Sequence, residues 1–513
     1  MEQNHTTEKT VKAISLVTMI TLVAKLLGIV REALQANTFG TTLQFDLYST
    51  AYNHTIYLFT TLAYALCVAA VPIISKKLSE GKKAVERSAG NLITACVILS
   101  LAICALGFVL VRFAPLERWF EFQGEAVEKL RGYLNICLPT LPLIVLIYLL
   151  VAVFQSMGNY SLQGSLSLPY NLALILFLLF FAGSEQMTEY VAAVCFAWLL
   201  QLAMILPVAW KRRFVLRPGL RLRDPDLKLF GRTALVTLFT TSIFLWCYLA
   251  DTNTVQPYGD GAVSGVYYAD KLFSPVATTL IYSISIVLFP KYNRAFTRTD
   301  DDGYKHYVGS TLNSTLFVIL PFSTLLGAFA LPVVRVLFER GNFDAASSAV
   351  TASIFSMYSL GMAGFCVLDL TNKAYYTMRK TLTPLLINGF VLLLNLVLNR
   401  LLASNRDPGL IALATSVSLS CGGVLALICF FRRSKNALAL SRLVKEIICA
   451  VITGVLAYLC SGALPQDQSK FRILVEYALL GLLGLAVYGA LCWLLGDREA
   501  LRTMFKRVRK GRD

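Results

Sequence analysis

The chain carries little charge for its length. Asp, Glu, Lys and Arg make up 15% of its 513 residues, whereas soluble domains have about 25%. Hydrophobic residues make up 56%, and the mean hydropathy is +0.63. This composition excludes an ordinary soluble domain and indicates a polytopic membrane protein.

Residues that bind metals are scarce or scattered. The three histidines, His5, His54 and His306, are far apart and form no metal motif. His54 lies within an apolar segment, where packing is favoured over a proton relay. The twelve cysteines stand singly, without the paired spacing of disulfides or zinc ligands. We therefore predict that they are small core residues and that the protein holds no metal.

Motifs of enzymes are missing as well. A polytopic glycosyltransferase or lipid phosphatase needs metal-binding acids or a general base on sizeable loops, and the loops here are short. There is no Gly-rich nucleotide loop, so ATP is not the energy source. The sequence predicts a transporter without a cofactor. It leaves open whether a coupling ion, the membrane potential or consumption of the product drives transport.

Apolar runs long enough to cross a ~30 Å hydrocarbon core recur along the chain. They predict an all-α integral membrane fold with about fourteen transmembrane helices. The first is predicted to be a retained helix, not a signal peptide. The predicted spans are residues 12–36, 45–75, 88–112, 131–155, 162–182, 189–210, 231–250, 262–290, 309–331, 348–372, 382–402, 409–431, 443–463 and 472–495.

The net charge of +17 is concentrated in alternate connections and in the C-terminal tail. The intervening connections are poor in cations or contain balancing acids, such as Glu117 and Asp251. This alternation is typical of topology signals and places both termini in the cytoplasm. We favour it over a nucleic-acid or specific lipid site. The basic clusters lie within residues 76–87, 211–232, 291–305, 373–380, 432–445 and 498–512.

An internal repeat is visible at a fixed spacing. The sequence TTLAY at residues 60–64 is followed by Pro72, and TTLIY at residues 278–282 is followed by Pro290, each 218 residues later. Six predicted spans fill this period, so the two copies cross the membrane in the same direction. The pattern predicts two pseudo-symmetric six-helix lobes that alternate access to a central site, plus two extra C-terminal helices.

This repeat gives the predicted domain organisation. The segments are a cytoplasmic N-terminal tail (1–11), an N-lobe (12–210), a basic cytoplasmic inter-lobe linker (211–232), a C-lobe (231–435), helices 13 and 14 (436–497) and a basic cytoplasmic tail (498–513).

Two lysines, Lys25 and Lys271, fall well inside apolar spans. A charge at membrane depth is costly and usually faces a water-filled cavity or a partner. Because the two lysines belong to different predicted lobes, they suit a multiply charged anion such as a diphosphate, although an ion pair between lobes is the alternative. Asp270 precedes Lys271, and the ~100° step between neighbours predicts that the two cannot simply neutralise each other.

Further charges accompany these lysines. Lys25, Gly28 and Glu32 share one helical face, on which Gly28 permits close approach of a helix or ligand. Arg31 lies nearer the outer end, where snorkelling to the interface is the alternative to a site role. Asp46, early in the second span, is a possible partner for a buried lysine.

Several motifs resemble those of the MurJ (MviN) type lipid II flippases of the multidrug/oligosaccharidyl-lipid/polysaccharide (MOP) exporter superfamily. The sequence YYADK at residues 267–271 is similar to the family's eighth-helix signature, which usually ends in Arg. The resemblance covers roughly the first twelve spans. The other motifs are Lys25, Gly28, Arg31 and Glu32 with Phe39, Gly40 and Asp46; PVVRVLFERGNFD at residues 332–344; AYY at 374–376; TLTP at 381–384; and Asn395 with Asn399.

The resemblance implies a flippase in the bacterial plasma membrane that moves undecaprenyl-pyrophosphate-linked peptidoglycan precursor to the outer leaflet. It implies that Lys25, Arg31 and Lys271 contact the diphosphate. Glu32, Asp46 and Asp270 would orient these cations or face the sugar-peptide part. The last two helices would form a groove for the lipid tail, and the motif at residues 337–344 would be a structural or gating element. Partners would be lipid II, membrane lipids and cell-wall synthesis proteins.

The chain also departs from the family pattern. Midway along the second helix, where the family usually has basic residues and an acid one turn later, it has Phe59, Thr60 and Tyr64. A cavity with fewer cations suits a different lipid-linked glycan, such as a teichoic or capsular precursor, so this substrate is the alternative. A cation-coupled drug exporter is less favoured, because the deep charges include lysines.

Overall fold

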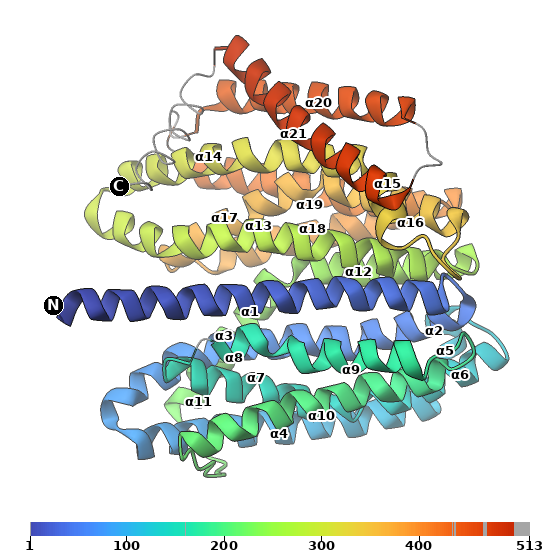
Figure 1. Ribbon diagram of the computed structural model, residues 1–513. Helices are drawn as coiled ribbons and strands as arrows, with labels where there is room; N and C mark the ends of the chain where they lie inside the picture. The colour runs from blue at the N-terminus through green and yellow to red at the C-terminus, as the bar shows by residue number, and fades with distance from the viewer. Residues whose placement is uncertain (1, 160, 433, 435–437, 465–468, 497–513) are drawn as a thin grey trace. The chain divides into compact units, whose positions relative to one another are not determined.

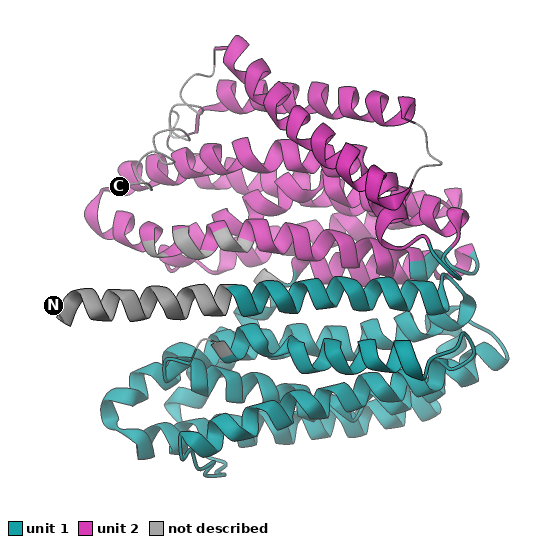
Figure 2. Ribbon diagram, in the orientation of Figure 1, with its two compact units in different colours: residues 1–242, 259–264, 340–343 teal, residues 243–258, 265–339, 344–513 magenta. Residues whose placement is uncertain are grey.

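The structure is a computed structural model that describes residues 2–159, 161–432, 434, 438–464 and 469–496 (Figure 1). Within these residues the secondary structure is helical, apart from one isolated bridge between Arg340 and Phe343. This confirms the all-α fold. The chain divides into two compact units, shown in different colours in Figure 2.

Unit 1 consists of residues 1–242, 259–264 and 340–343. Within it α3 packs on α7 and α11, α4 packs on α7, and α9 lies between α1 and α10. Its helices are α1 (Glu2–Phe39), α2 (Leu43–Tyr52), η1 (Asn53–Tyr57), α3 (Leu58–Lys77), η2 (Leu78–Glu80), α4 (Lys82–Phe113), α5 (Leu116–Phe120), α6 (Glu125–Cys137), α7 (Thr140–Ser156), α8 (Ser161–Ser165), α9 (Ser167–Phe180), α10 (Met187–Lys211) and α11 (Pro225–Thr241).

Unit 2 consists of residues 243–258, 265–339 and 344–513. Within it α19 packs against α16, α17 and α18, while α20 and α21 pack on α14. Its helices are α12 (Ile243–Val255), η3 (Gln256–Tyr258), α13 (Ala262–Arg298, whose first turn lies in unit 1), α14 (Asp301–Ala328), α15 (Ala330–Leu337), α16 (Ala345–Leu360), α17 (Met362–Thr377), α18 (Leu382–Leu402), η4 (Ala403–Asn405), α19 (Pro408–Phe431), α20 (Leu440–Ala463) and α21 (Lys470–Leu494).

Each of the fourteen predicted spans overlaps helices of the structure. In the described residues, ten helices are long and apolar enough to cross a membrane, and up to twelve if each of two bent pairs is one span. One bent pair is α16 with α17, which meet at 41°, and the other is α11 with α12. The fold is thus a multi-pass bundle, but the structure does not establish the count of fourteen.

Local sequence explains several helix starts. Two helices begin at an Asp-Pro pair, in which the carboxylate accepts a hydrogen bond from the first turn and proline occupies a position that needs no N–H donor. Asp224 Oδ1 lies 2.9 Å from the nitrogen of Asp226 at the start of α11. Asp407 Oδ1 lies 2.8 Å from the nitrogen of Gly409 at the start of α19.

The basic connection between α10 and α11 lies along α4 as a strap, which we define as residues 212–224. The backbone nitrogen of Val215 lies 3.3 Å from Glu86 Oε1, and Arg217 Nε lies 3.1 Å from Glu86 Oε2. The nitrogen of Arg221 donates to Asn91 Oδ1 at 2.7 Å. These bonds place the strap and α11 with unit 1. The compact units divide after residue 242.

The strap approaches α4 so closely that one position has no room for a side chain. A Cβ atom added to Gly90 would lie 1.9 Å from the carbonyl oxygen of Arg217. We therefore predict that Gly90→Ala displaces the strap, at a cost typical of overpacking, about 1–3 kcal/mol. Trypsin should then cleave the backbone after the lysine and arginine residues of segment 211–223 faster than in the unchanged protein.

A matched control is Gly389→Ala in α18, because a Cβ there meets nothing within 4 Å. This variant should keep the original rate of cleavage in the strap. Equal cleavage rates in both variants would contradict the assigned strap geometry.

Candidate functional site: two charge pairs on long helices

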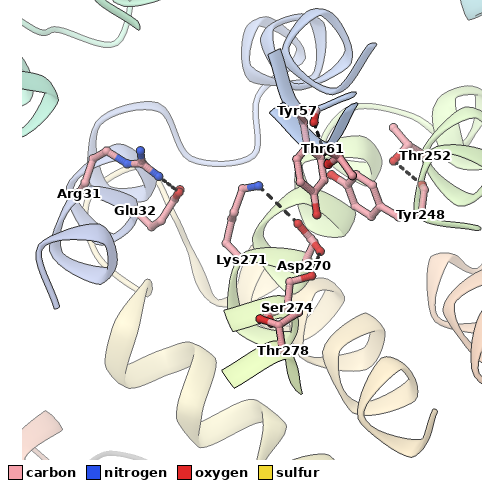
Figure 3. Close-up of polar contacts among 10 residues, drawn as sticks. All are labelled: Arg31, Glu32, Tyr57, Thr61, Tyr248, Thr252, Asp270, Lys271, Ser274 and Thr278. Carbon is pink, nitrogen blue, oxygen red and sulfur yellow. Dashed lines mark hydrogen bonds and ion pairs between the residues drawn. The ribbon is translucent and has the colours of Figure 1, made fainter. Parts of the chain in front are cut away.

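The first charge pair lies on α1 in unit 1 (Figure 3). Arg31 Nη2 donates to the carboxylate of the adjacent Glu32. The guanidinium carbon of Arg31 lies 5.1 Å from the ring centroid of Tyr170 on α9. Only 12% of the Arg31 side chain and 7% of the Glu32 side chain are exposed. A paired arginine stacked on an aromatic face is held in place, which argues against snorkelling.

Neighbouring helices fix this part of α1. Asn171 Nδ2 on α9 lies 3.0 Å from the carbonyl oxygen of Ala24, and the Tyr190 hydroxyl on α10 donates to Gln35 Oε1 at 2.6 Å. A Cβ on Gly28 would lie 3.6 Å from Asn171 Nδ2, an ordinary contact. Helix α9 thus packs where Gly28 predicted a close approach, but the spacing would also accept alanine.

Lys25 differs from the other charges of α1. Its side chain is exposed, whereas Glu32, predicted to lie on the same face, is buried. The structure therefore brings Glu32 together with Arg31. Lys25 remains accessible to a ligand.

The second charge pair lies on α13 in unit 2. Lys271 Nζ lies 3.3 Å from Asp270 Oδ2 (Figure 3). It also lies 4.6 Å from the ring centroid of Tyr267. The Ser274 hydroxyl donates to the other oxygen of Asp270. Asp270 is 1% exposed and the Lys271 side chain 14%. The prediction that these neighbours cannot neutralise each other was wrong, because the long lysine chain curls back across the step between adjacent positions.

The two charge pairs have the same arrangement of contacts. Each joins a cation to the carboxylate next to it in sequence and places the cation against a tyrosine ring. Each unit carries one pair on a long helix. In this arrangement a largely buried cation is balanced by the carboxylate next to it in sequence.

Asp46 has a different role from the predicted partner of a lysine. Its carboxylate lies 2.7 Å from the backbone nitrogens of both Gly261 and Ser264, and it accepts the Ser264 hydroxyl. These groups form the first turn of α13, so Asp46 acts as an N-terminal cap supplied by α2. The two bonded residues, Asp46 and Ser264, are 218 residues apart. This is the offset of the sequence repeat, so equivalent positions of the two copies meet here.

The motif at residues 340–343 binds to the C-terminal end of α1. The nitrogen of Asn342 donates to the carbonyl oxygen of Asn37 at 3.0 Å, and Asn342 Nδ2 lies 2.6 Å from the carbonyl oxygen of Thr38. Gly40 and Gly341 have φ of +62° and +54°, and a Cβ on either would collide with this contact. The motif thus satisfies carbonyls at the end of α1, as expected for a structural element.

Sequence reasoning missed a polar cluster inside unit 2. Asp251 was assigned to a connection, yet it lies in α12 and is fully buried. Its carboxylate accepts from the Tyr358 hydroxyl at 2.8 Å, Asn399 Nδ2 at 2.8 Å and Thr415 Oγ1 at 2.6 Å. Asn395 Nδ2 lies at 3.2 Å. A carboxylate with four donors tolerates burial. The available signal was Asn395 and Asn399 spaced one turn apart in an apolar span.

Two of the three residues at which the second helix departs from the family pattern, Phe59 and Thr60, make packing or backbone contacts within unit 1. Phe59 is 8% exposed, and Thr60 Oγ1 returns a hydrogen bond to the carbonyl oxygen of Ile56 at 2.6 Å. Tyr64 is 39% exposed. None of them adds a charge to the site.

The cysteines are all free, but the prediction that they are core residues holds only in part. Eight are buried and one is intermediate, whereas Cys421, Cys429 and Cys460 are exposed. Exposed positions on apolar helices face lipid as readily as buried positions face the core. In the described part of the chain, no group of three or more His, Cys, Asp or Glu is arranged to hold a metal.

The fold belongs to a known class of transporter. A solved structure described as "Lipid II flippase MurJ, inward closed conformation" matches with a TM-score of 0.76 and 19% identity, covering 94% of this chain and 100% of that chain. An inward-facing multidrug resistance MATE family transporter of the MOP superfamily matches with a TM-score of 0.63 and 12% identity, covering 82% of this chain and 98% of that chain. The bundle therefore has the same fold as these two transporters.

Sequence comparison narrows the class to one family. The lipid II flippase MurJ family matches residues 35–477. A probable lipid II flippase MurJ of Vibrio cholerae is 25% identical over 94% of this chain and 95% of that protein. The lipid II flippase MurJ of Burkholderia cenocepacia is 26% identical over 76% of this chain and 77% of that protein. The chain belongs to the MurJ family.

The capping role of Asp46 can be tested by stability. We predict that Asp46→Ala lowers the thermal stability of the detergent-solubilised protein, because buried N–H donors of α13 lose their acceptor at a cost of about 1–3 kcal/mol each. Asp260→Ala is the control, since Asp260 is an exposed acid in the same connection as Gly261. Equal melting temperatures for the two variants would show that the cap contributes nothing.

Proposed function

We propose that this protein is a lipid II flippase, which moves undecaprenyl-pyrophosphate-linked peptidoglycan precursor from the inner to the outer leaflet by alternating access. The observation that carries the proposal is the pair of largely buried cation sites, one on α1 and one on α13, in a chain of the MurJ family. The relatives are named as flippases, so the protein is a transporter in its peptidoglycan pathway and supports cell-wall synthesis and cell shape.

The charge pairs suggest how a diphosphate is held. Arg31 has a planar fork that can bind two phosphate oxygens, and Lys271 is a compact point charge. Without substrate, Glu32 and Asp270 neutralise these cations. A diphosphate carries more charge than one carboxylate, so it competes for both cations. The displaced carboxylates are then available to accept hydrogen bonds from the sugar-peptide part. Lys25, already exposed, supplies a third cation.

Alternating access requires one repeat to move against the other. Residues 259–264 and 340–343 are bonded to α2 and to the end of α1, and the chain continues directly from them into α13 and α16. We infer that these bonds are broken and remade when the site changes its exposure. Directional hydrogen bonds of this kind give two discrete states instead of a continuous drift.

The protein is a multi-pass membrane protein, and its proposed location is the bacterial plasma membrane with both termini in the cytoplasm. The cation-rich connections support this orientation. The proposed substrate is lipid II, and cell-wall synthesis proteins are proposed partners.

A second candidate substrate is another lipid-linked glycan, such as a teichoic or capsular precursor. The specific observation in its favour is Phe59, a packed aromatic residue in the part of the second helix that departs from the expected family pattern. Complementation separates the two candidates. Rescue of a strain that lacks its lipid II flippase favours lipid II, and failure of a well-expressed protein favours the other glycan.

Lysine variants test the site directly. Lys25→Ala and Lys271→Ala are each expected to abolish rescue of a flippase-depleted strain, with accumulation of lipid II in the inner leaflet and unchanged expression in the membrane. Lys291→Ala is the control, because this exposed lysine lies on the same helix as Lys271. Full activity of both site variants would mean that the lysines are structural.

A further inference from the structure

Unit 1 contains a polar cleft that the proposed transport site does not use. It has a volume of about 480 Å³ and lies between the end of α3, the start of α4 and the strap. Four cations line it, together with acids and backbone of the strap. The cations are Lys77, Arg87, Arg217 and Arg221.

Two of these four cations form ion pairs, and the other two can bind a ligand. Lys77 pairs with Glu80 at 2.9 Å, and Arg217 pairs with Glu86 at 3.1 Å. Arg87 and Arg221 are exposed, and neither has an ion-pair partner within the described part of the chain. Ser88, 9% exposed, also lines the cleft, and its hydroxyl has no hydrogen-bond partner among the described residues. Two guanidinium groups and a hydroxyl donor suit a phosphate.

An apolar groove continues from this cleft along the same helices. It has a volume of about 530 Å³ and is lined by apolar residues of α3, α4, α7 and α11. On α11 the cleft ends at Asp226 and the groove begins at Leu227. On α4 the cleft reaches Asn91 and the groove begins at Ala95, one turn later. Polar and apolar cavities therefore meet end to end.

The groove has the depth of a single leaflet. On α4 it runs from Ala95 to Ile103, which is about 12 Å along a helix at ~1.5 Å per residue. Half of a hydrocarbon core is about 15 Å. Leu99 and Leu235, on its rim, are 61% and 59% exposed, so the groove is open at its side. A second apolar cavity of about 230 Å³ shares Phe59 and Ile103 with it and extends the path.

We propose that the cleft and groove bind one anionic glycerophospholipid, with its phosphate at Arg87, Arg221 and Ser88 and an acyl chain along α3, α4 and α11. Charge complementarity selects the phosphate. The carboxylates of Asp224 and Asp226 also line the cleft. Beside their contacts with Asn91 and Lys77, each keeps lone pairs that can accept hydrogen bonds from headgroup hydroxyls, which makes phosphatidylglycerol the fitting lipid. This binding is independent of the transported substrate. It fixes α11 and the strap against α3 and α4.

The experiment measures lipid binding to the purified full-length protein by native mass spectrometry. Dioleoyl phosphatidylglycerol is titrated against dioleoyl phosphatidylcholine as the zwitterionic reference. The double variant Arg87→Gln with Arg221→Gln is expected to weaken phosphatidylglycerol binding by roughly tenfold or more. Arg298→Gln, which removes an exposed cation at the end of α13, should leave it unchanged.

A second variant tests the groove without touching the cations. Gly231 lines the groove, and a Cβ there meets nothing within 4 Å, so Gly231→Leu fills the groove from inside. It should weaken phosphatidylglycerol binding to a similar degree while the melting temperature in detergent stays the same. Gly389→Leu is its control, because Gly389 also has open space but lies on α18 in unit 2.

Three outcomes would overturn the proposal. One is phosphatidylglycerol binding that is the same in all four variants and the unchanged protein. Another is displacement of the lipid by millimolar inorganic phosphate, which would show a free-anion site. The third is displacement by undecaprenyl diphosphate at lower concentration than phosphatidylglycerol itself, which would assign the groove to the transported lipid. None of these outcomes bears on whether the protein flips lipid II.

Discussion

A charge on a membrane helix must have a partner or an aqueous face, and this constraint organises both units. Removing an ionised group from water costs several kcal/mol even after relaxation. The chain meets the constraint locally. Arg31 and Lys271 are each paired with the neighbouring carboxylate and backed by a tyrosine ring. Each cation is thus held beside a carboxylate that a phosphate can replace.

The same constraint acts on backbone groups at helix ends. The start of α13 receives the carboxylate of Asp46, and the end of α1 receives the amide groups of Asn342. Both partners come from segments distant in sequence. Such contacts are directional and either made or broken, which suits a transporter that changes between discrete states. Asp251, with its four donors, shows the opposite use of a buried carboxylate, as a fixed point inside unit 2.

Much of the fold could be predicted from the sequence because lipid imposes a simple rule on length and hydrophobicity. The helices, the repeat offset and the outlying lysines all follow from it. Side-chain partners could not be predicted in this way. Whether Lys271 turns toward Asp270 depends on rotamers and on the ring of Tyr267, and the burial of Asp251 depends on donors up to 164 residues away. The position of the strap along α4 could likewise not be predicted, because its contacts with Glu86 and Asn91 join residues far apart in the sequence.

The central claim is that the chain moves a diphosphate-linked lipid across the bilayer by means of cations in both units. The most direct measurement is transport by the purified protein in liposomes that contain fluorescent lipid II, with headgroup exposure read by a membrane-impermeant quencher. The account predicts that lipid II crosses between leaflets in liposomes with the protein and not in those with Lys271→Ala. Equal exposure in protein-free liposomes, or full transport by the variant, would contradict it.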